Sequence, residues 1–316
     1  MQPQHENWTL VEEFVLVGFT GINEGRLPLF AFFLVMYLLT LTENAILVLL
    51  VATERRLHTP MYFFLLHLSC LDMWYTSLTV PKMLASFGSP GGRIISYSAC
   101  LAQLYLFTFL GSTECFLLAA MAYDRYVAIC VPLRYQEMVG RDACMLLAAG
   151  SWLVGFLTPA LPIYFMSQLT FCGPNVIDHF FCDASPLIVL SCTDVSLKET
   201  VDFLVSLMVL LVSSVVIVVS YVRIISAVLK IHSVGGRRRA FSTCTAHLTV
   251  VSIFYGTLFF MYVRTKVASS INLNKVVSVF YAIVTPVLNP LIYSLRNAEV
   301  KGALYRVISK TKQLAT

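Results

Sequence analysis

The sequence contains few charged residues. Of its 316 residues, 12% are charged and 58% are hydrophobic. A soluble globular chain is about 25% charged and less than half apolar. A soluble domain of this length would have too few polar residues to cover its surface, and the abundance of apolar residues also excludes a disordered chain. The composition therefore predicts a helical membrane protein with several spans, each of about 20 to 25 residues.

Several sequence signals of other protein classes are missing. There is no repeated ten-residue alternation of the kind that builds a membrane β-barrel. Metal-ligand spacing, a phosphate-binding loop and a Ser/His/Asp arrangement are also missing, so we expect no enzyme and no bound cofactor. Residues 1–26 are polar and carry four acids, which is unlike a cleavable signal peptide.

Apolar runs separated by charged breaks predict seven transmembrane helices, and so an all-α membrane bundle. The spans cover residues 27–53, 61–87, 99–129, 144–166, 200–229, 241–263 and 276–295. Residues 1–26 form an N-terminal segment and residues 296–316 a C-terminal tail, in which a short amphipathic helix follows the seventh span.

Basic residues are concentrated on one side of the predicted membrane. One set of loops and the tail hold 15 of the 22 Lys and Arg residues with five acids, against seven bases and nine acids on the other side. The positive-inside rule puts the tail in the cytoplasm and the N-terminus outside. The net charge of +5 suits anionic membrane lipid and partner proteins rather than nucleic acid. Asn7 begins a glycosylation sequon on the outer side.

Four of the nine cysteines fall on the outer, oxidising side: Cys100, Cys172, Cys182 and Cys192. Four cysteines allow three pairings. A bridge from the long loop at about 167–199 to Cys100 would fix that loop over the bundle. The other five cysteines are expected to be small packing residues within or at the ends of spans.

Charged side chains within spans are costly, so each is a candidate functional residue. Asp72 and Glu114 face a bundle interior. They could share a cation such as sodium, one could be protonated, or both could belong to a polar cluster with water. Asp124 and Arg125 lie at the cytoplasmic end of the third span, either as a snorkelling pair or as a contact that opens to admit a partner. Pro286 and Pro290 must interrupt the hydrogen bonds of the seventh span.

Four motifs occur in order along nearly the whole chain. They are LHTPMYFF at 57–64, MAYDRYVAIC at 121–130 followed by PLRY at 132–135, AFSTC and AHL within 240–248, and PVLNPLIYSLRN at 286–297. Together they resemble an olfactory receptor of the rhodopsin-like G-protein-coupled class, in the tetrapod-type branch whose typical ligands are airborne odorants.

The resemblance implies the disulfides Cys100–Cys182 and Cys172–Cys192, and a sodium-like site at Asp72 and Glu114. It also implies a stimulatory, olfactory-type G protein that raises cyclic AMP, and a plasma-membrane location in olfactory cilia. The residues expected to act in G-protein coupling are Asp124, Arg125, Tyr126, Tyr221, Arg239 and Tyr293. The sequence departs from the family at Glu43, where Gly is usual, and at Arg239, which replaces Lys.

Helical spacing selects a predicted ligand pocket on the inner faces of the outer half-spans. Its residues are Leu104, Phe107, Thr108, Gly111, Ser112, Val205, Ser206, Val209, Tyr255, Leu258, Phe259, Tyr262, Val279, Ala282 and Ile283. Ordinary helix packing must account for some of them. The set is apolar with a few hydroxyls and no charge, which suits a small neutral organic molecule hydrogen-bonded to Tyr262. Lys266, about one turn above, could reach a carboxylate.

Two alternative functions remain. A rhodopsin-like receptor outside the nose that answers a metabolite would have the same pattern. A transporter would need internal repeats and charged pathways across the bundle, and the chain has no visible repeat.

Overall fold

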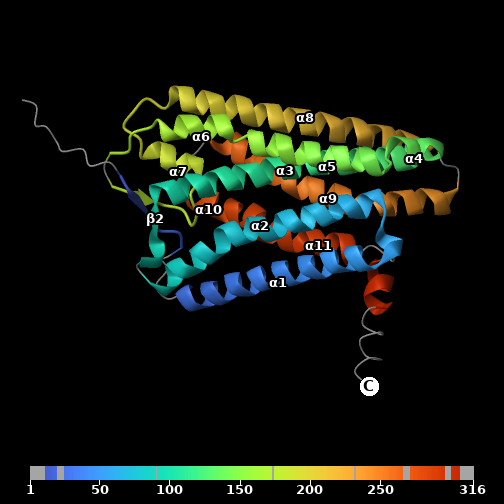
Figure 1. The fold of residues 1–316 in the computed structure, drawn as a ribbon, viewed down its shortest axis with the longest axis horizontal. Helices are drawn as coiled ribbons and strands as arrows, with labels where there is room; N and C mark the ends of the chain where they lie inside the picture. Colours follow the sequence, from blue (N-terminus) through green and yellow to red (C-terminus); the bar gives the residue numbers. More distant parts are fainter. Residues whose placement is uncertain are drawn as a thin grey trace, which may run out of the picture.

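The computed structural model describes residues 11–19, 25–89, 91–172, 174–230, 233–265, 271–295 and 300–306, except for the side chains at 234, 236–243, 260–265, 271–274 and 294–295. The long helices run side by side in one bundle, with short strands at one end (Figure 1). We call the end with the strands the outer end and the opposite end the cytoplasmic end, following the charge distribution.

Each predicted span is helical. Spans one, two, three, five and six are α1 (Arg26–Thr53), α2 (Pro60–Gly88), α3 (Tyr97–Cys130), α8 (Ser196–Leu229) and α9 (Val234–Thr265). Among the described residues, five helical stretches are long and apolar enough to cross a membrane, and α9 contains a shorter apolar stretch, Cys244–Phe259. The more polar α2 packs between α1 and α3. The predicted all-α seven-helix membrane bundle is therefore confirmed.

Span four is interrupted near a proline. It consists of α5 (Arg141–Leu157) and α6 (Ala160–Ser167), with Pro159 at the junction, and the short α4 (Tyr135–Met138) precedes it. Proline has no N–H to continue the helical hydrogen bonds, which explains why the helix breaks there although the predicted span was continuous.

Span seven contains a wider turn before its prolines. It comprises α10 (Ile271–Val279), a π-helical turn (Phe280–Val284) and α11 (Thr285–Leu295). Thr285 Oγ1 donates to the Phe280 carbonyl at 3.1 Å. Pro290 cannot donate to the Pro286 carbonyl, and Asn44 Nδ2 of α1 donates to it instead at 3.2 Å. The predicted interruption of the helical hydrogen bonds is confirmed, and the Pro286 carbonyl that it frees links α11 to α1.

A small sheet at the outer end was not predicted. β1 (Glu13–Leu16) pairs antiparallel with β2 (Ile94–Ser96) and parallel with β3 (Val176–Ile177), giving the order β2-β1-β3. The short α7 (Ala184–Val189) follows β3. We call residues 11–19 and 174–190 the roof, because the sheet joins the N-terminal segment to the loop between spans four and five.

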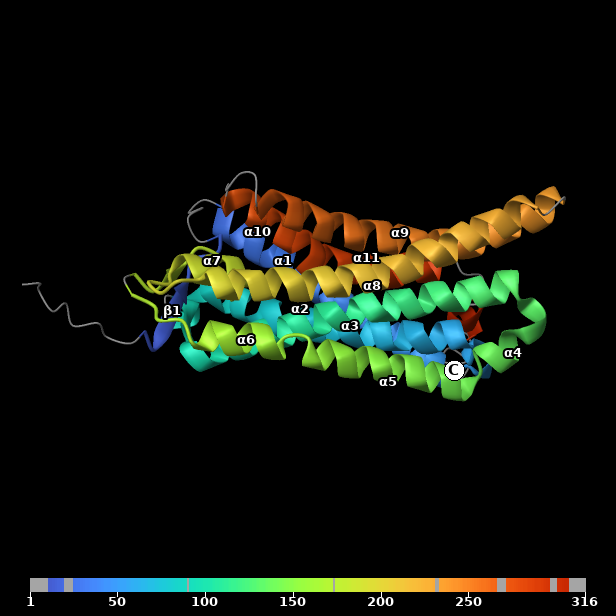
Figure 2. The same ribbon diagram turned by 90° about the horizontal axis from the view of Figure 1, so that it is seen from above.

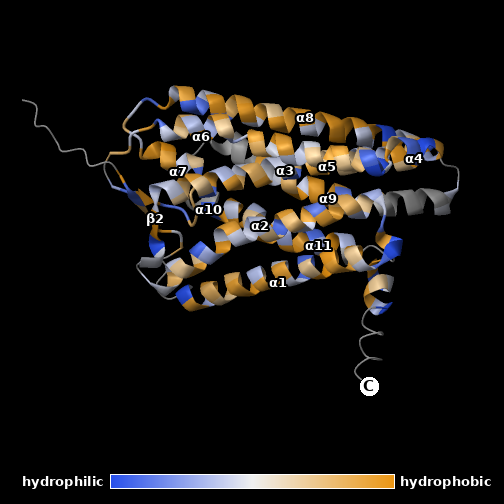
Figure 3. Ribbon diagram, viewed as in Figure 1, coloured by the Kyte–Doolittle hydropathy of each residue, from blue (hydrophilic) through white to orange (hydrophobic). Residues whose placement is uncertain are grey.

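The outward faces of the bundle are apolar. Hydrophobic residues cover α1 and α8 along most of their length (Figure 3). On α8 the exposed positions include Val212, Val215, Val218, Val219 and Val222. Exposed apolar side chains on this scale fit contact with lipid rather than water. The adjoining ends of α8 and α9 project beyond the other helices at the cytoplasmic end (Figure 2).

Residues 300–306 are helical after span seven, as predicted. Val300 and Ala303 are buried, whereas Tyr305 is 73% exposed, so this short helix is amphipathic. Arg306 Nη2 pairs with Glu54 Oε2 at 3.0 Å, which attaches the helix to the end of α1.

Candidate functional site

Four aromatic side chains meet in the outer half of the bundle. The Phe107 ring centroid lies 4.6 Å from that of Tyr75, 4.6 Å from that of Phe181 and 5.6 Å from that of Tyr281. We call these four residues the aromatic cluster. A methyl group on Gly111, one turn from Phe107, would meet only the Tyr75 hydroxyl within 4 Å, at 3.8 Å. A methyl group at Gly111 would therefore make only an ordinary van der Waals contact with Tyr75.

Most of the predicted pocket residues face the interior. Leu104, Phe107, Ser112, Val209, Ala282 and Ile283 are buried, and Thr108, Gly111, Val205, Ser206, Tyr255, Leu258 and Val279 are half-buried. Phe259 is 69% exposed, so its placement in the pocket is wrong. It lies on the outward side of α9, which helical spacing alone did not reveal. The Tyr262 side chain, Lys266 and Asn7 lie outside the described part of the chain.

Two disulfides form at the outer end, with the pairing that the family resemblance implied: one involves the roof, and the other joins the residues on either side of its segment 174–190. Cys100 is bonded to Cys182 and Cys172 to Cys192, with Cα–Cα distances of 5.4 Å and 5.7 Å. The first bond attaches the roof directly to the outer end of α3.

Buried Gln103 adds a second attachment beside the first disulfide. Its Oε1 accepts the Cys182 backbone N–H at 2.9 Å, and its Nε2 donates to the Leu78 carbonyl of α2 at 2.8 Å. Phe181 and its neighbour Asp183 are thereby fixed above α2 and α3.

Polar contacts also tie the roof to span seven. Lys275 Nζ lies 2.5 Å from Asp178 Oδ1 and donates to the Gly18 carbonyl at 3.1 Å. His179 Nε2 lies 3.2 Å from Ser278 Oγ, one helical turn along α10. Burial, assisted by the charge of Lys275, lowers the pKa of His179 to about 3. His179 is therefore neutral near pH 7 and acts here as a hydrogen-bonding group.

A surface groove of about 410 Å³ lies at the outer end, between the roof and the start of α3. Its lining residues are Val11, Glu12, Ser96, Tyr97, Ser98, Ser167, Leu169, Thr170 and Phe171. It includes no predicted pocket residue, so we do not treat it as the ligand site.

The two carboxylates in the middle of the bundle lie close together. Asp72 is 2% exposed and Glu114 is 7% exposed, and they interact electrostatically. Asn289 Nδ2 donates to both Asp72 oxygens at 3.1 Å. Within the described part of the chain, Glu114 Oε1 is buried without a hydrogen-bond partner, as is one oxygen of half-buried Glu43. A cation shared by Asp72 and Glu114 fits this donor set, and so does a shared proton.

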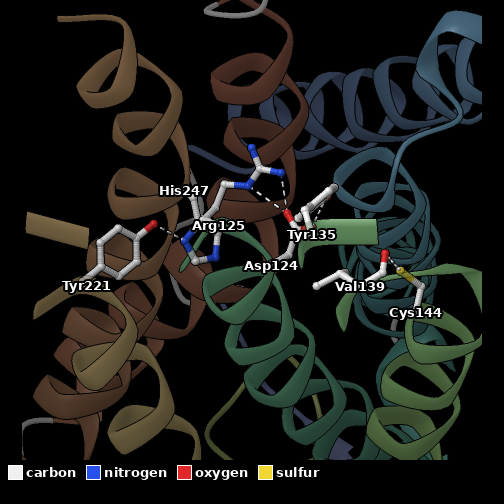
Figure 4. Close-up of polar contacts among 7 residues, drawn as sticks. All are labelled: Asp124, Arg125, Tyr135, Val139, Cys144, Tyr221 and His247. Atoms are coloured by element: carbon white, nitrogen blue, oxygen red, sulfur yellow. Dashed lines mark hydrogen bonds and ion pairs between the residues drawn. The ribbon is translucent and has the colours of Figure 1, made fainter. Parts of the chain in front are cut away.

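At the cytoplasmic end, Asp124 holds two neighbours (Figure 4). Arg125 Nε donates to Asp124 Oδ2 at 2.8 Å, and the Tyr135 hydroxyl donates to Asp124 Oδ1 at 2.6 Å. Asp124 is fully buried, and the Arg125 side chain is 12% exposed. Arg125 is therefore bound within the protein in this conformation.

A second contact next to Arg125 joins three helices (Figure 4). The Tyr221 hydroxyl of α8 lies 2.6 Å from His247 Nδ1 of α9, and His247 Nε2 lies 3.1 Å from the Leu118 carbonyl of α3. Since a carbonyl only accepts, Nε2 carries the proton and Nδ1 accepts from Tyr221. This contact keeps the cytoplasmic half of α9 against α3.

The other predicted coupling residues are less informative. Tyr126 is half-buried, and Tyr293 is 5% exposed with a buried hydroxyl that has no hydrogen-bond partner within the described part. The Arg239 side chain lies outside that part.

Sequence reasoning missed Tyr75, Phe181, Asp183, Tyr281 and His247 as site residues. Phe181 and Asp183 flank Cys182, so the implied disulfide was a signal for them.

Comparison with known proteins shows similarity to olfactory receptors along nearly the whole chain. The chain matches the family model described as olfactory receptor over residues 33–311. It is 69% identical over 310 residues to human olfactory receptor 6Q1, covering 98% of each chain. It is 53% identical to human olfactory receptor 6B1, covering 96% of each, and 50% identical to rat olfactory receptor 226, covering 94% of this chain and 92% of the relative.

Proposed function

This chain belongs to the olfactory receptor family, a family of G-protein-coupled receptors that are not enzymes, and on that premise we propose a specific ligand class and signalling route. It binds a small, mostly apolar, volatile molecule in the outer half of the bundle. It then activates a stimulatory, olfactory-type G protein and raises cyclic AMP. The receptor works at the plasma membrane, in olfactory cilia.

The observation that carries the ligand proposal is the aromatic cluster, next to which Gly111 leaves room for one methyl group. Phe107 packs on Tyr75, Phe181 and Tyr281 within 4.6 to 5.6 Å. Aromatic faces and a few polar groups, in a region closed by a disulfide-bonded roof, favour a compact apolar molecule.

The coupling proposal rests on the contacts at the cytoplasmic end. Arg125 is bound to Asp124, and His247 holds α9 to α3 and α8. Engagement of a G protein would require α9 to move away from α3 and Arg125 to turn toward the partner. The first step breaks neutral hydrogen bonds worth about 0.5–1.5 kcal/mol each, and the second breaks a bond to a charged group worth about 1.5–3 kcal/mol. A ligand can supply that amount through differential affinity for the two states.

Cyclic AMP measured in cells that express the receptor with an olfactory-type G protein tests the proposal. We expect odorant-dependent cyclic AMP from the unmodified receptor and none from Arg125→Ala, with equal surface staining. Arg56→Ala, which removes an exposed cytoplasmic arginine, is the control and should signal normally. Full signalling by Arg125→Ala would refute the role of Arg125. If the receptor responds to no odorant, the proposal that this region binds odorants is refuted.

We further propose that Asp72 and Glu114 hold a sodium ion. The charge of the ion would offset two buried carboxylates. Sodium should then raise the melting temperature of the purified receptor above its value in choline buffer, and Asp72→Asn should abolish the difference. Equal melting in both buffers would favour a shared proton instead.

A further inference from the structure

Three charged side chains lie together at the outer end, where the roof meets α8. Lys198 is paired with Asp202, one turn further along α8. The Lys198 side chain is 2% exposed and that of Asp202 is 27% exposed. Asp183 of the roof interacts electrostatically with both. We call Asp183, Lys198 and Asp202 the charged cluster.

The charged cluster has more acceptors than its lysine satisfies. The ammonium of Lys198 bonds Asp202 Oδ2, whereas Asp202 Oδ1 is buried without a hydrogen-bond partner in the described part of the chain. Two carboxylates facing one ammonium leave an excess charge of about −1. An enclosed carboxylate without its own cation is unfavourable, so a cationic group from outside the protein would be stabilised here.

Asp183 lies at the start of α7 and also interacts with the aromatic cluster. It occupies the N-cap position, where Asp commonly accepts a hydrogen bond from the second or third helical residue, but its carboxyl bonds the backbone of Ala184 instead. It interacts electrostatically with Tyr75 and Tyr281 of the aromatic cluster. Its backbone position is fixed by the preceding disulfide at Cys182.

Asp202 extends the predicted pocket face by one turn. Val205, Ser206 and Val209 follow it at spacings of three, four and seven residues, so all four share one face of α8. Glu114 of α3 also interacts electrostatically with Tyr75 from deeper in the bundle, whereas the negative charge on the outer side comes from the roof and from α8. The charged cluster therefore borders the aromatic cluster on its outer side.

We propose that the ligands of this receptor are small protonated amines with an apolar body, whose ammonium group is bound by Asp183 and Asp202 while the body packs on the aromatic cluster. An ammonium group also interacts favourably with aromatic faces. This inference rests on the proposed odorant function and specifies its ligand class. It also replaces our sequence-based expectation of a neutral ligand, which considered the helices alone.

The test compares amines, alcohols and carboxylic acids that share one carbon skeleton. Dose–response curves for cyclic AMP should show the lowest half-maximal concentration for the amine. A hydrogen bond to a charged group is worth about 1.5–3 kcal/mol. Asp183→Asn should therefore raise the half-maximal amine concentration by about 13- to 160-fold. The same variant should change the response to the alcohol little, because a neutral molecule does not need the carboxylate charge.

Two further variants keep the result interpretable. Asp194→Asn changes an exposed acid of the same loop, which is bonded to Ser196, and should leave every curve unchanged. Asp202→Asn preserves the shape of the side chain and should also weaken the amine response selectively. Surface staining reports whether each variant folds.

The outcomes separate this inference from the function on which it rests. Activation by alcohols but not by amines would overturn the amine proposal and leave the odorant function intact. Best activation by carboxylic acids would make Lys198 the recognising group and would also overturn it. Equal shifts for amine and alcohol in both Asn variants would show that the charged cluster only supports the fold.

Discussion

Gly155 of α5 lies where span four meets span three, and its replacement gives a sharp test of that packing. Gly155 is buried, and a Cβ at this position would lie 2.9 Å from the Thr113 backbone nitrogen and 3.0 Å from its Cα, overlapping the Thr113 hydroxyl as well. Two of these three atoms belong to the backbone. A side-chain rotation cannot relieve the overlap, so the helices must separate.

The expected cost of Gly155→Ala follows from two opposing effects. Overpacking of a filled interior costs about 1–3 kcal/mol, and contact with backbone favours the upper end of that range. Alanine in place of glycine within a helix recovers about 1 kcal/mol. The net loss should be about 2 kcal/mol, which lowers the melting temperature by several degrees.

A matched control exists on the same helix. Gly150, also in α5, has no atom within 4 Å of the position that a Cβ would occupy. Gly150→Ala should therefore raise the melting temperature of the purified receptor or leave it unchanged, while Gly155→Ala lowers it. Thr113→Ala should rescue Gly155→Ala only partly, because the backbone contacts remain. Equal melting of the two alanine variants would refute the close approach of α3 and α5.

Three further predictions concern the roof and the cytoplasmic end. Cys100→Ser and Cys182→Ser should lower surface expression to a similar degree, and the double variant should be little worse; additive losses would contradict a shared bond. Burial raises the pKa of Asp183 to about 6, so lowering the outside pH from about 7.4 to about 5.5 should weaken amine responses about fourfold as this carboxylate gains its proton. The Asp183 carboxyl is also faced by Asp202, Lys198, Tyr75 and Tyr281. The pH effect is therefore assigned to Asp183 only if it disappears in Asp183→Asn. His247→Phe removes two hydrogen bonds that hold α9, which should shift the equilibrium toward the open state by about 5- to 160-fold and raise basal cyclic AMP; an unchanged basal level would exclude His247 from that role.

The spans could be predicted because lipid leaves the backbone few options. Every N–H and C=O in the hydrocarbon region must be satisfied within the protein, so a long apolar run has to be helical. The same argument covers the exception at Pro286 and Pro290. A proline frees a carbonyl, and a nearby polar group such as Asn44 has to satisfy it. The predicted orientation of the chain in the membrane likewise depends on the charges of many residues, so no single charged residue on the unexpected side alters it.

The outer sheet could not be predicted for the opposite reason. β1, β2 and β3 have four, three and two residues, too few to show the alternation that marks a strand. Outside the membrane, water can satisfy the backbone, so composition does not dictate a structure. The Cys100–Cys182 bond holds the segments of β2 and β3 close together, and Lys275 binds both Asp178 after β3 and the Gly18 carbonyl after β1.

The error at Phe259 and the omission of Asp183 have a common origin. Helical spacing gives the angle of a residue around its own helix, but not how that helix is turned toward its neighbours. It also says nothing of a loop that returns over the bundle. Asp183 reaches the ligand region because the disulfide at Cys182 and the Gln103 hydrogen bond fix the backbone on one side of it. Under the amine proposal, the aromatic cluster supplies an apolar surface, and the roof together with the outer end of α8 supplies the charge. Substitutions next to Cys182 should therefore change which functional group is recognised, whereas substitutions at Phe107 should change which carbon skeleton fits.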